Sequence, residues 1–165
     1  MEVDLLVIGH ISKDINIDLE RREEAVGGAV VFTSCAAQQA GAALLAVTKR
    51  SPADDPCLAV FRDRGIPIVA CDSTATTSIR NTYPTADRER RTCEALAQAD
   101  AFLAEDIPSD VIARIYYLGG LMLGEFPPEF VRAMAARGDV ALDVQGFVRV
   151  NDAGALVFRD WAEKR

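Results

Sequence analysis

The sequence predicts an α/β protein with a doubly wound, Rossmann-like and mostly parallel sheet, and a small β ribbon outside that sheet. First, residues 4–9 and 43–48 are short, mostly apolar runs, which are typical of strands buried on both faces. Second, helical patterns at residues 29–40 and 57–64 follow these runs, and such alternation indicates parallel crossovers. Third, residues 74–83 read TATTSIRNTY, a β-branched and polar segment that predicts a partly exposed strand.

The first elements follow from local patterns. Residues 4–9 (DLLVIG) predict the first strand, and residues 15–18 alternate apolar and polar side chains, as a half-exposed strand does. Gly27 and Gly28 separate this region from an alanine-rich helix, and Gly41 is a suitable C-terminal stop for that helix. The chain therefore enters its first helix through a pair of glycines.

The same kinds of pattern predict the later strands and helices. Residues 66–71 predict a strand, and residues 107–112 a short helix. Residues 115–118 (IYYL) predict another strand, and two prolines open a helix over residues 127–137. Residues 140–143 then predict a strand that ends in a carboxylate.

We expect these elements to form two units. Residues 1–73 and 95–165 make the α/β core, and residues 74–94 make the β ribbon, whose second strand returns after a turn. Residues 14–24 are a further candidate for the ribbon.

Composition limits the functions that the chain can have. The 165 residues are 50% hydrophobic and carry a formal net charge of −7, which argues against a nucleic-acid partner. We expect a cytoplasmic protein without a membrane partner, because no apolar run could span a bilayer and the N-terminus has no basic leader. Arg88, Arg90 and Arg91 form one basic cluster, which we expect to be a solvated loop. Since His10 is the one histidine and the four cysteines are dispersed, we expect no metal site.

The Gly27-Gly28 pair is the most informative candidate site. Glycine lets the backbone turn sharply and approach a ligand, and the following helix start offers free N–H donors. Such a corner can hold a polyhydroxylated or anionic small molecule. The alternative is a tight turn that only packs the helix against the sheet.

Four segments together resemble the N-terminal half of ribokinase-like (PfkB-type) carbohydrate kinases. They are DLLVIGHISKD at residues 4–14, the Gly27-Gly28 helix start, the ribbon at residues 76–83 and LDVQGFVR at residues 142–149. The variant with TTSI-x-N-x-Y and DVQGFVR resembles a sugar-kinase-like branch and, to a lesser degree, plant myo-inositol kinases. The resemblance runs through essentially the whole chain but covers about half of such a kinase, so the chain looks truncated.

The resemblance implies a kinase that transfers the γ-phosphoryl group of ATP, with Mg²⁺, to a hydroxyl of a sugar, polyol or nucleoside. The ribbon would be a lid over this substrate. Asp14 would accept hydrogen bonds from substrate hydroxyls, Gly27 and Gly28 would contact the substrate, and Gln145 would lie near the phosphate-transfer region. A carboxylate suits vicinal hydroxyls. For Asp14 the alternative is a turn or cap residue, and for Gln145 a loop amide that satisfies a backbone group.

Other positions are candidates of the same site. Asn81 lies in the predicted lid, where ordinary cross-strand pairing is the alternative. Lys49 and Arg80 could meet a phosphate, although most such side chains are solvated. Phe32 stands where ribokinases usually carry an asparagine for the sugar, so we expect it to reshape or shrink the pocket and to change the specificity.

The sequence contains no G-A-G-D segment, which in the family carries the catalytic base and an anion hole. We therefore predict that this chain alone has no kinase activity, contains no catalytic residue and binds neither ATP nor Mg²⁺ tightly. A non-catalytic polyol-binding or assembly module is the first alternative. An unrelated nucleotide binder is the second, although no G-x-G-x-x-G follows the first strand. We also expect a homo-oligomer, because half of a doubly wound sheet exposes an edge.

Overall fold

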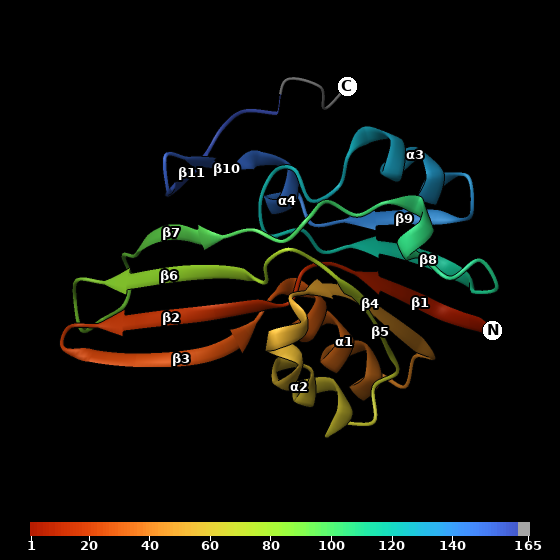
Figure 1. Cartoon of the computed structure of the whole chain (residues 1–165), viewed down its shortest axis with the longest axis horizontal. Helices are drawn as coiled ribbons and strands as arrows, with labels where there is room; N and C mark the ends of the chain where they lie inside the picture. Colours follow the sequence, from red (N-terminus) through yellow and green to blue (C-terminus); the bar gives the residue numbers. More distant parts are fainter. Residues whose placement is uncertain (162–165) are drawn as a thin grey trace.

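The computed structural model describes residues 1–161, which fold into two sheets with helices packed around the first (Figure 1). The first sheet has five parallel strands in the order β5-β4-β1-β8-β9. Their bounds are Glu2–Ile8 for β1, Leu44–Arg50 for β4, Ile68–Asp72 for β5, Ile112–Leu118 for β8 and Asp139–Leu142 for β9.

Both faces of this sheet are covered, because alternate side chains of its central strand point to opposite sides. Leu6 and Ile8 of β1 join one apolar core, whereas Val7 joins the other. The first core packs under α3 (Pro128–Ala135), and the second packs under α1 (Ala29–Gln39) and α2 (Ala59–Arg62). The structure thus confirms the predicted doubly wound α/β fold (Figure 1).

The second sheet is mixed and has six strands in the order β10-β11-β7-β6-β2-β3. The β2–β6 pair is parallel and the other pairs are antiparallel. In Figure 1 its strands extend to the left of the first sheet. Their bounds are Ser12–Asp18 for β2, Arg21–Gly27 for β3, Thr77–Tyr83 for β6, Thr92–Ala97 for β7, Arg149–Asp152 for β10 and Ala155–Phe158 for β11.

The chain passes directly between the sheets at two places. β1 of the first sheet ends at Ile8, and β2 of the second begins four residues later. β3 ends at Gly27, and α1 begins at Ala29. Because these connections are so short, the second sheet is held at the carboxyl ends of the parallel strands, where open α/β sheets bind ligands.

The structure differs from the sequence expectation in two segments. Residues 149–158, which we assigned to the core, form the β10–β11 hairpin of the second sheet, and this hairpin pairs with β7 through Ala155 and Glu94. Residues 107–112 form no helix: a 3₁₀ turn, η2, covers Ala104–Asp106, and β8 begins at Ile112. Six residues with a proline at the second position are too few to stabilise a helix without strong packing.

The remaining helices are short. η1 (Pro52–Leu58) leads into α2, and α4 covers Gln145–Val148 just after β9. No helix in residues 1–161 has both the length and the apolar character needed to cross a bilayer.

Candidate functional site

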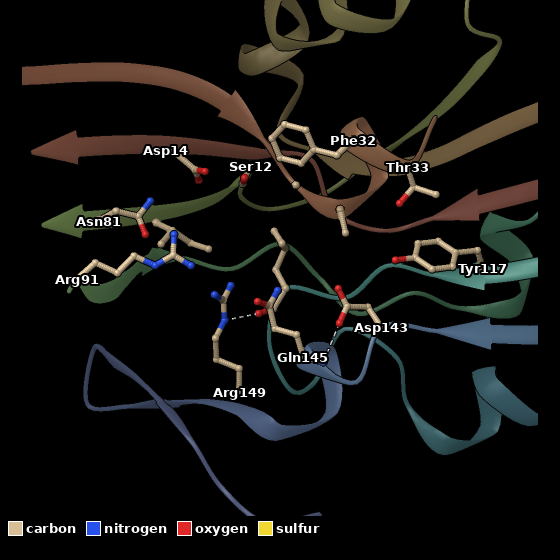
Figure 2. A pocket seen from close by; sticks show the side chains of 14 residues that line it. Ser12, Asp14, Phe32, Thr33, Asn81, Arg91, Tyr117, Asp143, Gln145 and Arg149 are labelled. Atoms are coloured by element: carbon tan, nitrogen blue, oxygen red, sulfur yellow. Dashed lines mark hydrogen bonds between the residues drawn. The ribbon is translucent and has the colours of Figure 1, made fainter. Parts of the chain in front are cut away.

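A cavity of about 340 Å³ lies between the two sheets, beside the start of α1 (Figure 2). Second-sheet residues line one side, and residues that follow β8 and β9 line the other. A cavity of this size suits a small molecule. Five of the six substrate-binding candidates from the sequence line it, namely Asp14, Gly28, Phe32, Asn81 and Gln145.

The two glycines have different roles at this corner. Gly28 has a φ of 108°, and a Cβ there would lie 2.5 Å from the His10 carbonyl oxygen, so only glycine fits. A Cβ on Gly27 would lie 2.6 Å from Oδ2 of Asp14. Gly27 does not line the cavity itself, but it leaves room for the carboxylate that does.

Asp14 offers an unsatisfied acceptor to the cavity. Its Oδ1 atom is buried and has no hydrogen-bond partner among the described residues, and the same is true of Ser12 Oγ nearby. Burial raises the pKa of the Asp14 carboxyl, whereas the nearby Ser12 hydroxyl and then the positive charges of Arg149 and Arg91 act in the opposite direction. A buried acceptor without a partner is costly, so a ligand hydroxyl at this position would be stabilising.

Asn81 and Gln145 are held in place by their neighbours. Asn81 Nδ2 donates to Asn16 Oδ1 at 3.1 Å, and the Cys93 thiol donates to Asn81 Oδ1 at 3.3 Å. The backbone N–H of Gln145 donates to Asp143 Oδ1 at 2.9 Å, while its side-chain amide lies 3.4 Å from the Gly120 carbonyl oxygen. Both side-chain amides thus form hydrogen bonds within the protein, as expected for cross-strand pairing of Asn81 and for a loop amide at Gln145. Both also face the cavity (Figure 2).

Phe32 is 67% exposed and lines the cavity from the first turns of α1. An aromatic ring with this exposure lies at the rim of the cavity, so it can narrow the entrance without filling the interior.

Lys49 and Arg80, the two candidate phosphate contacts, do not line the cavity. Lys49 is buried and its Nζ lies 2.8 Å from Asp106 Oδ2. Arg80 lies between the cavity-lining residues Ile79 and Asn81 on β6, so its side chain points to the opposite face of the sheet. There its guanidinium group forms an ion pair with the Glu94 carboxylate, with an N–O distance of 3.2 Å. Both side chains have structural partners instead of a place in the site.

The structure adds side chains that the sequence interpretation missed. Arg91, which we placed in a solvated loop, and Arg149 both direct their guanidinium groups into the cavity (Figure 2). Tyr117 and Asp143 line its other side. The carboxylate at the end of a predicted strand was a signal for Asp143, whereas no local pattern distinguishes Arg91 from its neighbours.

The described residues contain no group of three or more His, Cys, Asp or Glu side chains placed to hold a metal ion.

Comparison with solved structures places this arrangement in a known class. A pyrophosphate-dependent kinase of the ribokinase family, solved with a pyrophosphate analog and myo-inositol, is 32% identical with a TM-score of 0.86; the match covers 95% of this chain and 55% of that one. The chain therefore has the fold of the ribokinase family of kinases, as its sequence motifs predicted.

Two further structures show how far the similarity extends. A pyrophosphate-dependent myo-inositol-1 kinase, which mutation converts into a myo-inositol-3 kinase, is 31% identical with a TM-score of 0.85, over 96% of this chain and 54% of that one. The adenosine kinase from Sinorhizobium meliloti shares the fold, with 18% identity and a TM-score of 0.65 over 87% of this chain and 57% of that one. This chain thus spans just over half the length of these kinases. No protein-family model and no curated protein matches the sequence.

Proposed function

We propose that this chain is the acceptor-binding part of a kinase that phosphorylates a hydroxyl of a sugar or polyol, and that the cavity between its two sheets holds this acceptor. The observation that carries the proposal is the buried, unpartnered Oδ1 atom of Asp14 beside the glycine corner. A carboxylate oxygen there can accept hydrogen bonds from ligand hydroxyls. The second sheet borders the cavity and would act as the lid that excludes water.

The identity of the acceptor and of the phosphoryl donor follows from similarity. A related kinase was solved with myo-inositol and a pyrophosphate analog, so a cyclic polyol is our first candidate for the acceptor. The sequence resemblance implies ATP with Mg²⁺ as donor, whereas similarity to this relative points to pyrophosphate. We favour pyrophosphate, since the relatives that share about a third of their residues with this chain are pyrophosphate-dependent.

Isothermal titration calorimetry with the 165-residue chain and myo-inositol, extended to other sugars, polyols and nucleosides, tests this proposal. We expect saturable binding, and we expect Asp14→Asn to weaken it by about tenfold or more, as loss of a charged hydrogen-bond acceptor does. Asp18→Asn is the matched control, because Asp18 lies on the same strand but pairs with Arg88 and does not line the cavity.

The pH dependence of binding gives an independent check. Burial raises the pKa of Asp14, and the ionised carboxylate is the stronger acceptor, so affinity should fall as the pH is lowered through that raised pKa. Asp14→Asn should remove this dependence. A folded chain that binds none of these compounds would contradict the proposal.

The alternative, a non-catalytic polyol-binding or assembly module, is favoured by one observation: the sequence contains no G-A-G-D segment. Incubation of the chain with a bound polyol and either ATP or pyrophosphate tests whether this chain alone transfers phosphate. We expect binding without phosphoryl transfer from this chain alone, and transfer would contradict our prediction that it has no activity.

A further inference from the structure

Arg149 is a buried cation that forms no ion pair with any described residue. It begins β10, only 5% of the residue is exposed, and its Nε donates to the Leu121 carbonyl oxygen at 2.6 Å. Its two terminal nitrogens form no ion pair with any described residue and face the cavity (Figure 2). The buried Lys49, by contrast, pairs with Asp106. An unpaired buried charge is costly, which suggests that a ligand completes the site.

Arg91 directs a second guanidinium group toward the same part of the cavity (Figure 2). The two positive charges repel each other: burial lowers the pKa of Arg149 and the charge of Arg91 lowers it further, whereas Cys93, Glu125 and Asp14 act in the opposite direction. Asp14 is the one cavity-lining carboxylate whose charge acts on both arginines. Counted over the groups that line this end of the cavity, two arginines and one aspartate leave one positive charge in excess; the buried Glu125 carboxyl does not line the cavity but also acts on Arg149.

Asp143 does not balance this charge. Its carboxylate accepts a hydrogen bond from the Gln145 N–H and lies with Tyr117 on the side of the first sheet, whereas Arg91 and Arg149 lie on the side of the second sheet (Figure 2). The cavity therefore has a positive end under the second sheet and a negative group at the other end.

We propose that Arg91 and Arg149 bind an oxyanion carried by the acceptor, so that the substrate is a polyol or sugar with a phosphate ester or a carboxylate. This inference rests on the proposed function. Guanidinium groups match the planar, two-oxygen geometry of both anions. In this arrangement Asp14 accepts hydrogen bonds from the neighbouring hydroxyls of the same substrate.

Calorimetry with matched pairs of ligands tests the inference. The pairs are myo-inositol with myo-inositol 1-phosphate, glucose with glucose 6-phosphate, and glucose with glucuronate; inorganic phosphate and pyrophosphate are titrated alone. We expect one anionic ligand to bind about tenfold or more tightly than its neutral parent. The pair that shows this gain distinguishes a phosphate ester from a carboxylate.

Variants assign the gain to the arginines. Arg91 is exposed, so Arg91→Gln should fold normally, and it should weaken binding of the anionic ligand about tenfold, more than it weakens binding of the neutral parent. Arg149→Lys keeps the positive charge but loses the planar guanidinium group, so it should also weaken binding of the anionic ligand. Arg80→Gln is the matched control, since Arg80 pairs with Glu94 outside the cavity, and it should change neither affinity.

Three results would overturn the inference. Equal affinity for anionic ligands and their neutral parents would refute it and leave the proposed function standing. Inorganic phosphate or pyrophosphate that binds alone as tightly as the anionic polyols would assign the arginines to the donor or to a free anion. Failure of every polyol, neutral or charged, to bind would remove the proposed function and this inference with it.

Discussion

Glu125 shows how a single buried carboxyl joins the two sheets. The residue is completely buried, and its Oε1 accepts hydrogen bonds from the backbone N–H groups of Leu121 and Met122 at 2.8 and 3.0 Å. Its Oε2 has no hydrogen-bond partner and lies 3.6 Å from Nδ1 of His10. That ring nitrogen is also 3.0 Å from Thr77 Oγ1 on β6, so the cluster connects the end of β1 to the second sheet.

We expect this carboxyl to make the stability of the protein depend on pH. Burial raises the pKa of Glu125 above its ordinary value of 4.5, although His10 and the backbone N–H groups act in the opposite direction. The folded state therefore keeps the proton to a higher pH than the unfolded state does. The stability that the protonated Glu125 carboxyl contributes is fully present below pH 4.5, and it is lost as the pH rises through the raised pKa of the folded state.

Urea unfolding of the wild type and of Glu125→Gln between about pH 4 and pH 8 measures this effect. The glutamine keeps an acceptor for both N–H groups and cannot ionise, so the variant should gain stability relative to the wild type as the pH rises. Glu125→Ala removes the acceptor and should cost about 1–3 kcal/mol for each N–H left unpaired, at every pH. A difference between wild type and Glu125→Gln that does not change with pH would contradict the expectation.

At the scale of elements, α4 is positioned by a contact between two glycines. A Cβ on Gly146 would lie 2.6 Å from the Cα of Gly120, so the helix packs directly on the backbone that follows β8. This contact places Gln145 at one end of the helix and Arg149 just beyond the other. One close backbone approach thus sets two side chains of the cavity.

We therefore expect Gly146→Ala to displace α4 and to weaken ligand binding by about tenfold or more, with a loss of stability of about 1–3 kcal/mol. Gly154→Ala is the comparison for backbone strain alone, because Gly154 has a positive φ of 97°, which Gly146 does not, and a Cβ there meets no atom within 4 Å. Thermal unfolding and calorimetry of both variants separate backbone strain from displacement of the helix. Normal ligand affinity in Gly146→Ala would show that α4 does not set the site.

At the scale of the molecule, the exposed apolar surface near α4 and β11 indicates association. Phe158 is 69% exposed and Leu123 50% exposed, and β9 leaves one edge of the first sheet unpaired. Such edges and apolar side chains favour pairing with a second chain.

We expect the chain to self-associate, and we expect Phe158→Thr to shift it toward the monomer because it removes the most exposed aromatic side chain. Ile112→Thr is a suitable control, since Ile112 is 60% exposed at the opposite, amino end of the parallel strands. Size-exclusion chromatography with light scattering reports the molar mass. A wild-type chain that stays monomeric at high concentration would count against this expectation.

The class of fold and the glycine corner could be read from local patterns in the sequence, which also marked Asp14 as a candidate for the site. Short apolar runs and their alternation with helices are local patterns, so the parallel sheet could be predicted from them. The glycine pair was equally visible, because the residue type reports a conformation that other residues avoid.

Only the tertiary structure decided which charged side chains meet in the cavity. Arg149 reaches it because the β10–β11 hairpin pairs with β7, more than fifty residues earlier in the chain, as the Ala155–Glu94 register shows. Lys49 and Arg80 are excluded because partners from other segments, Asp106 and Glu94, hold them elsewhere. The local pattern of apolar and polar residues shows whether a segment is a helix or a strand. Which of its faces meets a ligand depends on pairing with distant segments, which the sequence of one segment does not show.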